Sequence, residues 1–204
     1  MRVLVACEYS GRVRDAFLKR GHDAISCDLL PTDVPGPHYQ GDVRDIINDG
    51  WDLMVCHPEC TYLTVSGLHW NERDPVRKAL TEDALDFVRY LLDCSIPKIA
   101  LENPVGCIST RIRKPDQIIQ PYEFGEDASK KTCLWLKNLS LLPIEPFMRY
   151  PGRIVTDPRT GKQVERWSNQ TDSGQNRLPP SKDRWKIRSE TYRGIATAMA
   201  EAWG

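Results

Sequence analysis

Long apolar runs are missing from this chain of 204 residues. No stretch of about 18 apolar residues occurs, which argues against a membrane-spanning helix. The first six residues are charged and then apolar, but Glu8 interrupts the run too early for the apolar region of a secretory signal. We therefore expect a cytoplasmic protein, which would be the cytoplasm of a bacterial host if a phage encodes the chain.

The cysteine pattern of a small disulfide-bonded scaffold is also missing. The chain has seven cysteines, an odd number, without regular spacing. Such a set is typical of a reducing compartment in which thiols stay free. We therefore expect at least one cysteine to be available as a reactive thiol.

The whole chain has no net charge, but its two halves carry net charges of opposite sign. Residues 1–104 hold 11 Lys or Arg against 17 Asp or Glu, and residues 105–204 hold 17 against 11. The charge is therefore −6 in the first half and +6 in the second. The basic half could face a polyanion, although ordinary variation of a protein surface accounts for the split equally well.

Short apolar runs alternate with helical patterns in the first half of the chain. We expect strands at residues 2–7, 23–28, 51–56 and 98–101. A helix is expected between the first two, up to Gly21, and Asp74-Pro75 begins the strongest helical pattern, with Leu80 and Leu91 on its apolar stripe. This alternation predicts an α/β fold with a mostly parallel sheet and helices on both faces.

The second half of the chain has a looser pattern. Residues 132–136 predict a strand, and the polar stretch 150–176 predicts a long loop or hairpin, in effect a small recognition insert at about 150–180. Ser189 is expected to cap a last helix that carries Ile195, Met199 and Ala202 on one face. An apolar helix at this point must dock on the sheet, so we expect residues 1–204 to form one domain.

A thiol and a carboxylate each follow a predicted strand. Cys60 comes shortly after the strand 51–56, and Glu102 directly after 98–101. Chemistry in an open α/β sheet gathers at the carboxyl ends of its strands. The pair therefore predicts a cysteine nucleophile beside an acid, against the alternative that Cys60 is simply a buried residue.

The turn after the first strand, residues 8–11, is expected to expose backbone amides at a helix start, where anions or polar cofactor groups bind. It lacks both the three-glycine dinucleotide motif and the ending of a phosphate-binding P-loop. Asp28 could bind two ribose hydroxyls or be a solvated residue at a strand end. Asp42 could accept from an adenine amino group or cap a helix.

The order of these motifs resembles that of the DNA cytosine-5 methyltransferases, in particular the short phage-encoded members. The matching elements are Tyr9-Ser10-Gly11, Asp28, Gly41-Asp42, Pro58-Glu59-Cys60, Glu102-Asn103-Pro104 and a late helix at 191–198. The resemblance implies a Rossmann-like S-adenosylmethionine-dependent methyltransferase fold whose last helix packs beside the first. It also implies methylation of cytosine C5 in DNA, through a cysteine adduct at C6.

The resemblance assigns a role to each matching residue. Cys60 would be the nucleophile, and Glu102 the acid that binds the target ring. The cofactor would be S-adenosyl-L-methionine. Tyr9 would lie against its adenine, Asp42 would bind the adenine amino group, and Asp28 would bind the ribose. Ser10 and Gly11 would lie beside the methionine part, Pro58 would shape the pocket, and Thr191 would complete it.

The chain departs from the family in its first loop, in Glu59 beside the cysteine, and in having too little length after Pro104 for a target-recognition domain. Residues 150–176, or partner subunits of a homo-oligomer, would have to supply recognition. Phosphate contacts are predicted for the following residues: Arg111, Arg113, Lys130, Lys131, Arg177, Lys182, Arg184, Lys186 and Arg188. Trp167 and Trp185 could stack on an extruded base, or be packed aromatics.

Three other functions stay open at this point. A zinc site could use Cys56, His57 and Cys60, although a second closely spaced ligand pair is missing. The chain could instead be a catalytically silent relative that only binds nucleic acid. It could also modify a free pyrimidine nucleotide, which would account for the missing recognition domain.

Overall fold

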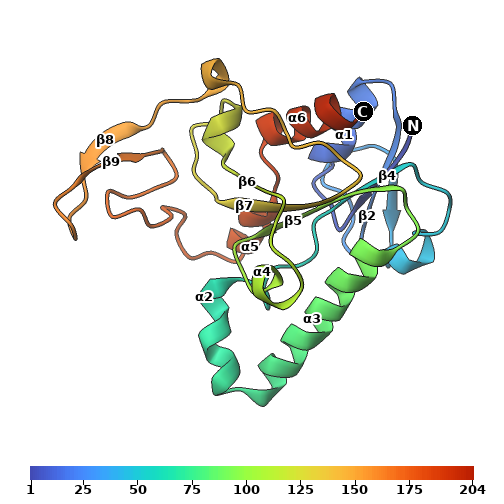
Figure 1. Cartoon of the computed structure of the whole chain (residues 1–204), viewed down its shortest axis with the longest axis horizontal. Helices are drawn as coiled ribbons and strands as arrows, with labels where there is room; N and C mark the ends of the chain where they lie inside the picture. Colours follow the sequence, from blue (N-terminus) through green and yellow to red (C-terminus); the bar gives the residue numbers. More distant parts are fainter.

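A computed structural model describes all residues, 1–204, and its centre is a seven-stranded sheet in the order β3-β2-β1-β4-β5-β7-β6 (Figure 1). The strands are β1 (Arg2–Ala6), β2 (Asp23–Asp28), β3 (His38–Gln40), β4 (Leu53–Cys56), β5 (Lys98–Pro104), β6 (Gln117–Ile119) and β7 (Thr132–Lys137). The longer helices are α1 (Arg12–Lys19), α3 (Pro75–Asp93) and α6 (Arg193–Trp203).

Neighbouring strands from β3 to β5 run parallel, whereas β7 runs antiparallel between β5 and β6. The order β3-β2-β1-β4-β5 is that of a doubly wound Rossmann sheet. The predicted fold class, a Rossmann-like α/β fold with a mostly parallel sheet, is therefore confirmed.

Alternation along the strands divides the core into two layers. Val3 and Val5 face a cluster that includes α1 and α6, and Leu4 and Ala6 face a second cluster that includes α3. Helices thus cover both faces, with α6 beside α1 on one of them (Figure 1). The docking of the last helix on the sheet, next to the first helix, is confirmed.

Three local predictions are wrong. Ser189 does not cap the last helix, because it ends a separate short helix, α5 (Arg184–Ser189), and Tyr192 precedes α6. The fourth strand does not stop at residue 101, since pairing with β7 extends β5 through Glu102 to Pro104. Leu80 is exposed at 37%, because the buried face of α3 runs through Thr81, Leu85, Val88 and Leu91.

The remaining elements are short and lie around the sheet. They are η1 (Val43–Asp45), α2 (Val65–Leu68), η2 (His69–Glu72), α4 (Ile108–Arg111), η3 (Pro121–Phe124), η4 (Pro146–Met148), β8 (Arg153–Thr156) and β9 (Gln163–Arg166). The strands β8 and β9 form a separate antiparallel hairpin that projects from the body (Figure 1). The predicted polar stretch 150–176 is therefore a hairpin with a following loop. No helix has the length and apolar character that crossing a membrane requires.

Candidate functional site

Two side chains from adjacent strands meet at the carboxyl end of the sheet. Alternation places Glu102, like Ala100, on the face of α6, and His57, which directly follows β4, lies on the same face. The parallel register pairs Cys56 with Leu101, so the next residues along, His57 and Glu102, are neighbours. The ladder thus brings an imidazole and a carboxyl group together.

Glu102 lines a hollow of about 210 Å³, a volume that includes space open to solvent. The other lining residues are Lys130, Thr132, Thr191, Tyr192 and Ile195. They come from the loop before β7, from β7 itself and from the start of α6. The hollow therefore lies between the end of the sheet and the last helix, and two of its six lining residues are hydrophobic.

The charge of Glu102 is set by its neighbours. Burial acts to raise its pKa, but a hydrogen bond from His57 and the cation of Lys130 outweigh this effect, and the pKa is lowered. The His57 Nδ1 atom lies 3.1 Å from Glu102 Oε2. Because the pKa is lowered, the carboxyl group is ionised at neutral pH and accepts this hydrogen bond.

Cys60 is partly exposed in the turn after β4. Burial raises the pKa of its thiol, the Glu102 carboxylate raises it further, and the cations of Lys130 and Arg188 lower it. The Glu59 carboxylate is exposed and accepts a 2.7 Å hydrogen bond from the Thr61 hydroxyl. Cys60 and Glu102 are therefore electrostatically coupled, with Lys130 acting on both.

Asn103 fixes the loop that carries Cys60. Its side chain faces away from Glu102, as the alternation in β5 requires, and its Nδ2 donates a 2.7 Å hydrogen bond to the Pro58 carbonyl. Asn103 is almost fully buried, and its Oδ1 atom has no partner. Glu102 thus lines the hollow, while the next residue, Asn103, holds the loop of Cys60.

The amides at the start of α1 are not free, contrary to expectation. The Glu8 carboxylate accepts from the amides of Val13 and Arg14, at 2.7 and 3.3 Å, and from the Ser10 hydroxyl at 3.1 Å. Gly11 adopts a left-handed conformation with φ of 71°. A side chain of the protein therefore occupies the predicted anion position, because a buried helix start needs acceptors.

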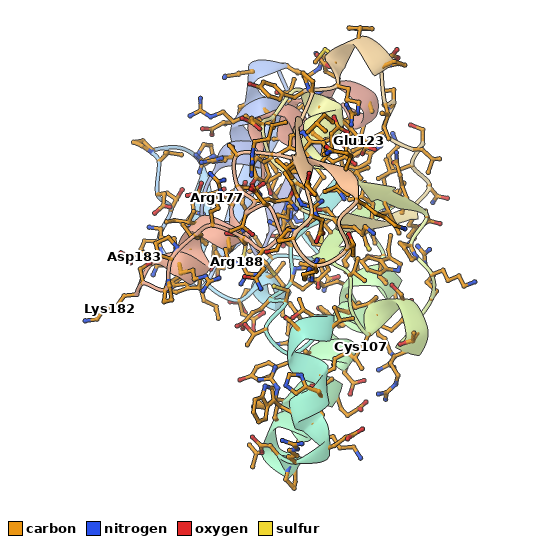
Figure 2. The ribbon with its side chains drawn as sticks, turned by 90° about the vertical axis from the view of Figure 1, so that its left-hand side faces the viewer. Cys107, Glu123, Arg177, Lys182, Asp183 and Arg188 are labelled. Atoms are coloured by element: carbon orange, nitrogen blue, oxygen red, sulfur yellow. The ribbon has the colours of Figure 1, made fainter.

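Helix α5 covers Tyr9. The Tyr9 hydroxyl lies 2.9 Å from the Lys186 carbonyl and 2.6 Å from Ser189 Oγ, and the ring lies 6.0 Å from that of Trp185. Lys186 pairs with Asp33 at 2.5 Å. Figure 2 shows Lys182 projecting outward from this basic segment, with Arg188 closer to the body of the protein.

Asp28 is the last residue of β2, and Asp42 lies in the connection after β3. Both carboxylates, after burial itself, help to raise the pKa of the Cys7 thiol. Asp28 Oδ1 accepts from the Leu30 amide at 2.9 Å, and burial raises its own pKa. Asp42 caps η1 and pairs with Arg44 at 2.9 Å, so the capping alternative is realised for this residue.

The basic residues predicted to contact phosphate lie in different parts of the structure. Lys130 lies beside Glu102, and Lys131 is exposed next to it. Arg111 pairs with Glu82 and Arg113 with Asp116, and neither lines the hollow. Trp167 is not available for a base, because it stacks on Tyr122 at 3.9 Å between ring centres.

The ligand set of the zinc alternative does not form. The Cys56 side chain is fully buried in the core, whereas His57 binds Glu102 on the opposite face of the sheet. No group of three or more His, Cys, Asp or Glu side chains has an arrangement that could hold a metal ion.

Sequence reasoning missed the pairing of His57 with Glu102, and the contributions of Thr132 and Tyr192 to the hollow. The His57 contact could have been inferred by placing the predicted strands side by side, since each residue is one step beyond Cys56 or Leu101. The other two could not, because they depend on the antiparallel insertion of β7 and on the entry of α6.

No model of a known protein family matches the sequence, and no curated protein is significantly similar to it. Among solved structures, the fold is similar to that of a prophage-encoded protein of E. coli described as a candidate DNA modification methyltransferase. The TM-score is 0.45 and the sequence identity 15%, over 69% of this chain and 49% of that one. The match thus covers about half the length of that solved structure.

Proposed function

We propose that the protein is a DNA (cytosine-5)-methyltransferase that uses S-adenosyl-L-methionine. The observation that carries the proposal is the coupling of Cys60 with Glu102 at the carboxyl ends of two adjacent strands. A cysteine that is electrostatically coupled to an acid matches the chemistry that cytosine C5 demands, because this carbon is too weak a nucleophile to accept a methyl group unaided.

In this mechanism Cys60 and Glu102 exchange one proton. The resting pair is a thiol and a carboxylate, since burial raises the pKa of Cys60 while His57 and Lys130 lower that of Glu102. Addition of the cysteine to the cytosine ring needs a thiolate and a protonated carboxyl group. One proton therefore moves from the sulfur to the carboxyl group, with no change in total charge. The cations of Lys130 and Arg188 favour the thiolate.

The thiolate then adds to C6 of the cytosine, and Glu102 holds its proton at ring N3. A carbon–sulfur bond forms, and the electron pair of the C5–C6 double bond becomes available at C5. S-adenosylmethionine, when bound, supplies the methyl group. Solvent water then takes the C5 proton, the C5–C6 double bond forms again as the carbon–sulfur bond breaks, and Cys60 leaves as a thiolate. Return of the proton from Glu102 to Cys60 restores the resting pair. The target base must be extruded from a duplex, because C6 is shielded in the stack.

The donor set of the site fits the cofactor. Asp28 keeps one carboxylate oxygen without a protein partner, which suits ribose hydroxyls. Asp42 lies nearby, and Thr191 provides a polar wall on the side of Glu102. We propose that Tyr9, Ser10, Gly11 and Pro58 complete the cofactor site.

We further propose that DNA binds across the basic residues on the same side as the hollow. Lys130 lines it, Lys131 is the next residue and is exposed, and the segment 177–188 adds five cations. We propose that the hairpin and loop at about 150–180, which project from the body, contact the duplex as the recognition insert of a single domain (Figure 1). Arg111 and Arg113 could contact phosphates only by exchanging their carboxylate partners.

The experiment incubates the protein with labelled S-adenosylmethionine and mixed DNA and then digests the DNA to nucleosides. Label in 5-methyl-2′-deoxycytidine is the expected result. Cys60→Ala should abolish transfer and keep cofactor binding, and Asp28→Ala should weaken cofactor binding. Cofactor or DNA binding without transfer in the wild type would instead indicate a catalytically silent relative. In a parallel incubation with free cytidine nucleotides in place of DNA, label in the nucleotide would indicate an enzyme that modifies free pyrimidine nucleotides.

A further inference from the structure

His57 occupies a position that the sheet itself determines. Its amide donates a 3.0 Å hydrogen bond to the Ala6 carbonyl, which extends the pairing of β4 with β1 by one residue. The ring is therefore held on the α6 face, with a side chain that is only 9% exposed. Glu102, 13% exposed, is its neighbour on β5. Both groups are built into the rigid part of the fold.

The hydrogen bond between them has a defined direction. An ionised carboxylate can only accept, so the hydrogen lies on His57 Nδ1. No other protein group donates to the Glu102 carboxyl group, and Oε1 has no protein partner. His57 therefore holds one carboxylate oxygen and leaves the other free.

The second ring nitrogen of His57 is buried and has no partner. A histidine that only stabilises a core satisfies both of its ring nitrogens, because a buried polar atom without a partner costs about 1–3 kcal/mol. Groups of this kind call for an explanation other than stability. The only polar contact of the His57 ring is the one with Glu102.

We infer that His57 is the positioning residue for Glu102, which it orients so that Oε1 is presented to the ring of the substrate. The inference rests on the proposed function and deepens it. None of the side chains that line the hollow forms a hydrogen bond with the Glu102 carboxyl group, so His57 is the residue that orients it.

Several other groups influence Glu102 from the elements around it. Lys130 approaches from the loop before β7 and lowers its pKa. The thiols of Cys60 in the turn, Cys56 in β4 and Cys133 in β7 are each affected by the Glu102 carboxylate. Any test must therefore separate the loss of the His57 hydrogen bond from a general change of charge.

Two variants make this separation. His57→Ala removes the donor, whereas His57→Asn keeps an N–H group at the position of Nδ1. We expect His57→Ala to lower kcat by about 10- to 100-fold, as misplacement of a reacting group does, with an unchanged KM for the cofactor. His57→Asn should retain most of the activity. His22→Asn, at the other end of the sheet, is the matched control for replacing a histidine.

The pH profile gives a readout that a purely structural role would not move. Without the donor, burial dominates and the pKa of Glu102 rises, so the acidic limb of the rate profile should move to higher pH in His57→Ala. It should stay in place in His57→Asn. A wild-type rate in His57→Ala, an unshifted limb, or equal losses in both variants would overturn the positioning role.

The ¹⁵N NMR spectrum of the His57 ring tests the contact without any activity. We expect the Nδ1-protonated tautomer in the wild type and its loss in Glu102→Ala. A ring protonated only on Nε2 would overturn the inference. If the wild type transfers no methyl group to cytosine, the proposed function fails, while the NMR result still decides whether His57 positions Glu102.

Discussion

Glu102 and Asn103 are consecutive residues of β5 that act on opposite faces of the sheet. The carboxyl group of Glu102 lines the hollow below α6, and the Asn103 amide donates to the Pro58 carbonyl on the loop that carries Cys60. One strand thus fixes both members of the proposed catalytic pair.

Replacing Asn103 should therefore disturb the catalytic loop. In Asn103→Ala the Pro58 carbonyl loses its 2.7 Å donor, and we expect a loss of about 1–3 kcal/mol in the free energy of unfolding, the cost of a buried unpaired group. Urea unfolding measures this loss, and methyl transfer should fall with cofactor affinity largely kept. An unchanged unfolding midpoint would show that the loop is held in another way.

Removing the charge of Glu102 should make Cys60 more acidic. The Glu102 carboxylate raises the pKa of the thiol, so in Glu102→Gln this contribution disappears and the pKa falls. Below the wild-type pKa, a larger fraction of Cys60 is then thiolate and reacts faster with iodoacetamide. The measurement is the alkylation rate of the Cys60 peptide against pH, by mass spectrometry.

Glu59→Gln is the matched control for this experiment. Glu59 is closer to Cys60 in sequence, but its carboxylate is exposed and bonded to Thr61. We expect the alkylation profile of Cys60 to keep its midpoint in this variant. A shift in Glu59→Gln as large as that in Glu102→Gln would mean that the two groups are not specifically coupled.

The turn after β1 should depend on Glu8 for stability. Glu8→Ala leaves the amides of Val13 and Arg14 without an acceptor in a buried position, and we expect a loss of about 1–3 kcal/mol. Thermal or urea unfolding measures it. Glu201→Ala is the control, because its ion pair with Arg20 is exposed and should contribute less than about 1 kcal/mol.

The sequence predicted the parallel half of the sheet because local patterns determine it. Residues 23–28 form a strand where expected, and Pro75 begins α3. It failed where tertiary contacts decide the outcome. The length of β5 depends on β7, an antiparallel partner more than 20 residues away. The apolar stripe of α3 was misplaced because Thr81 is buried where its hydroxyl donates to the Tyr62 carbonyl, whereas the neighbouring Leu80 is exposed.

In the candidate site, too, residues in sequence motifs were predicted, whereas residues whose role depends on tertiary contacts were not. Cys60, Glu102 and Thr191 were expected from motif order, and the structure brings Glu102 and Thr191 to one hollow and couples Cys60 to it. Trp167 was offered as a stacking residue, but its ring packs on Tyr122 instead. A single sequence cannot distinguish these cases, because an aromatic side chain has the same pattern whether its partner is a base or another ring.

The last prediction concerns access to the hollow. The enclosed part of the hollow has room for little more than one water molecule, and its lining residue Lys130 donates a 2.8 Å hydrogen bond to the Arg188 carbonyl in α5. A cofactor of nucleoside size therefore needs the segment around α5 to move. Lys186 holds this segment to the β2 loop through Asp33. Asp33→Asn breaks that ion pair and keeps the 2.9 Å hydrogen bond from the Asp33 amide to the Tyr9 carbonyl.

We expect Asp33→Asn to loosen α5 only modestly, since a partly exposed ion pair contributes about 0–1 kcal/mol, or up to roughly a fivefold change in an opening equilibrium. Trypsin should cleave after Lys186 and Arg188 faster by up to that factor, and added S-adenosylmethionine should associate faster to a similar extent. High salt should produce the same acceleration in the wild type, because it screens the pair, and should add little in the variant. If cleavage and association do not change together, the movement of α5 and the opening of the hollow are separate events.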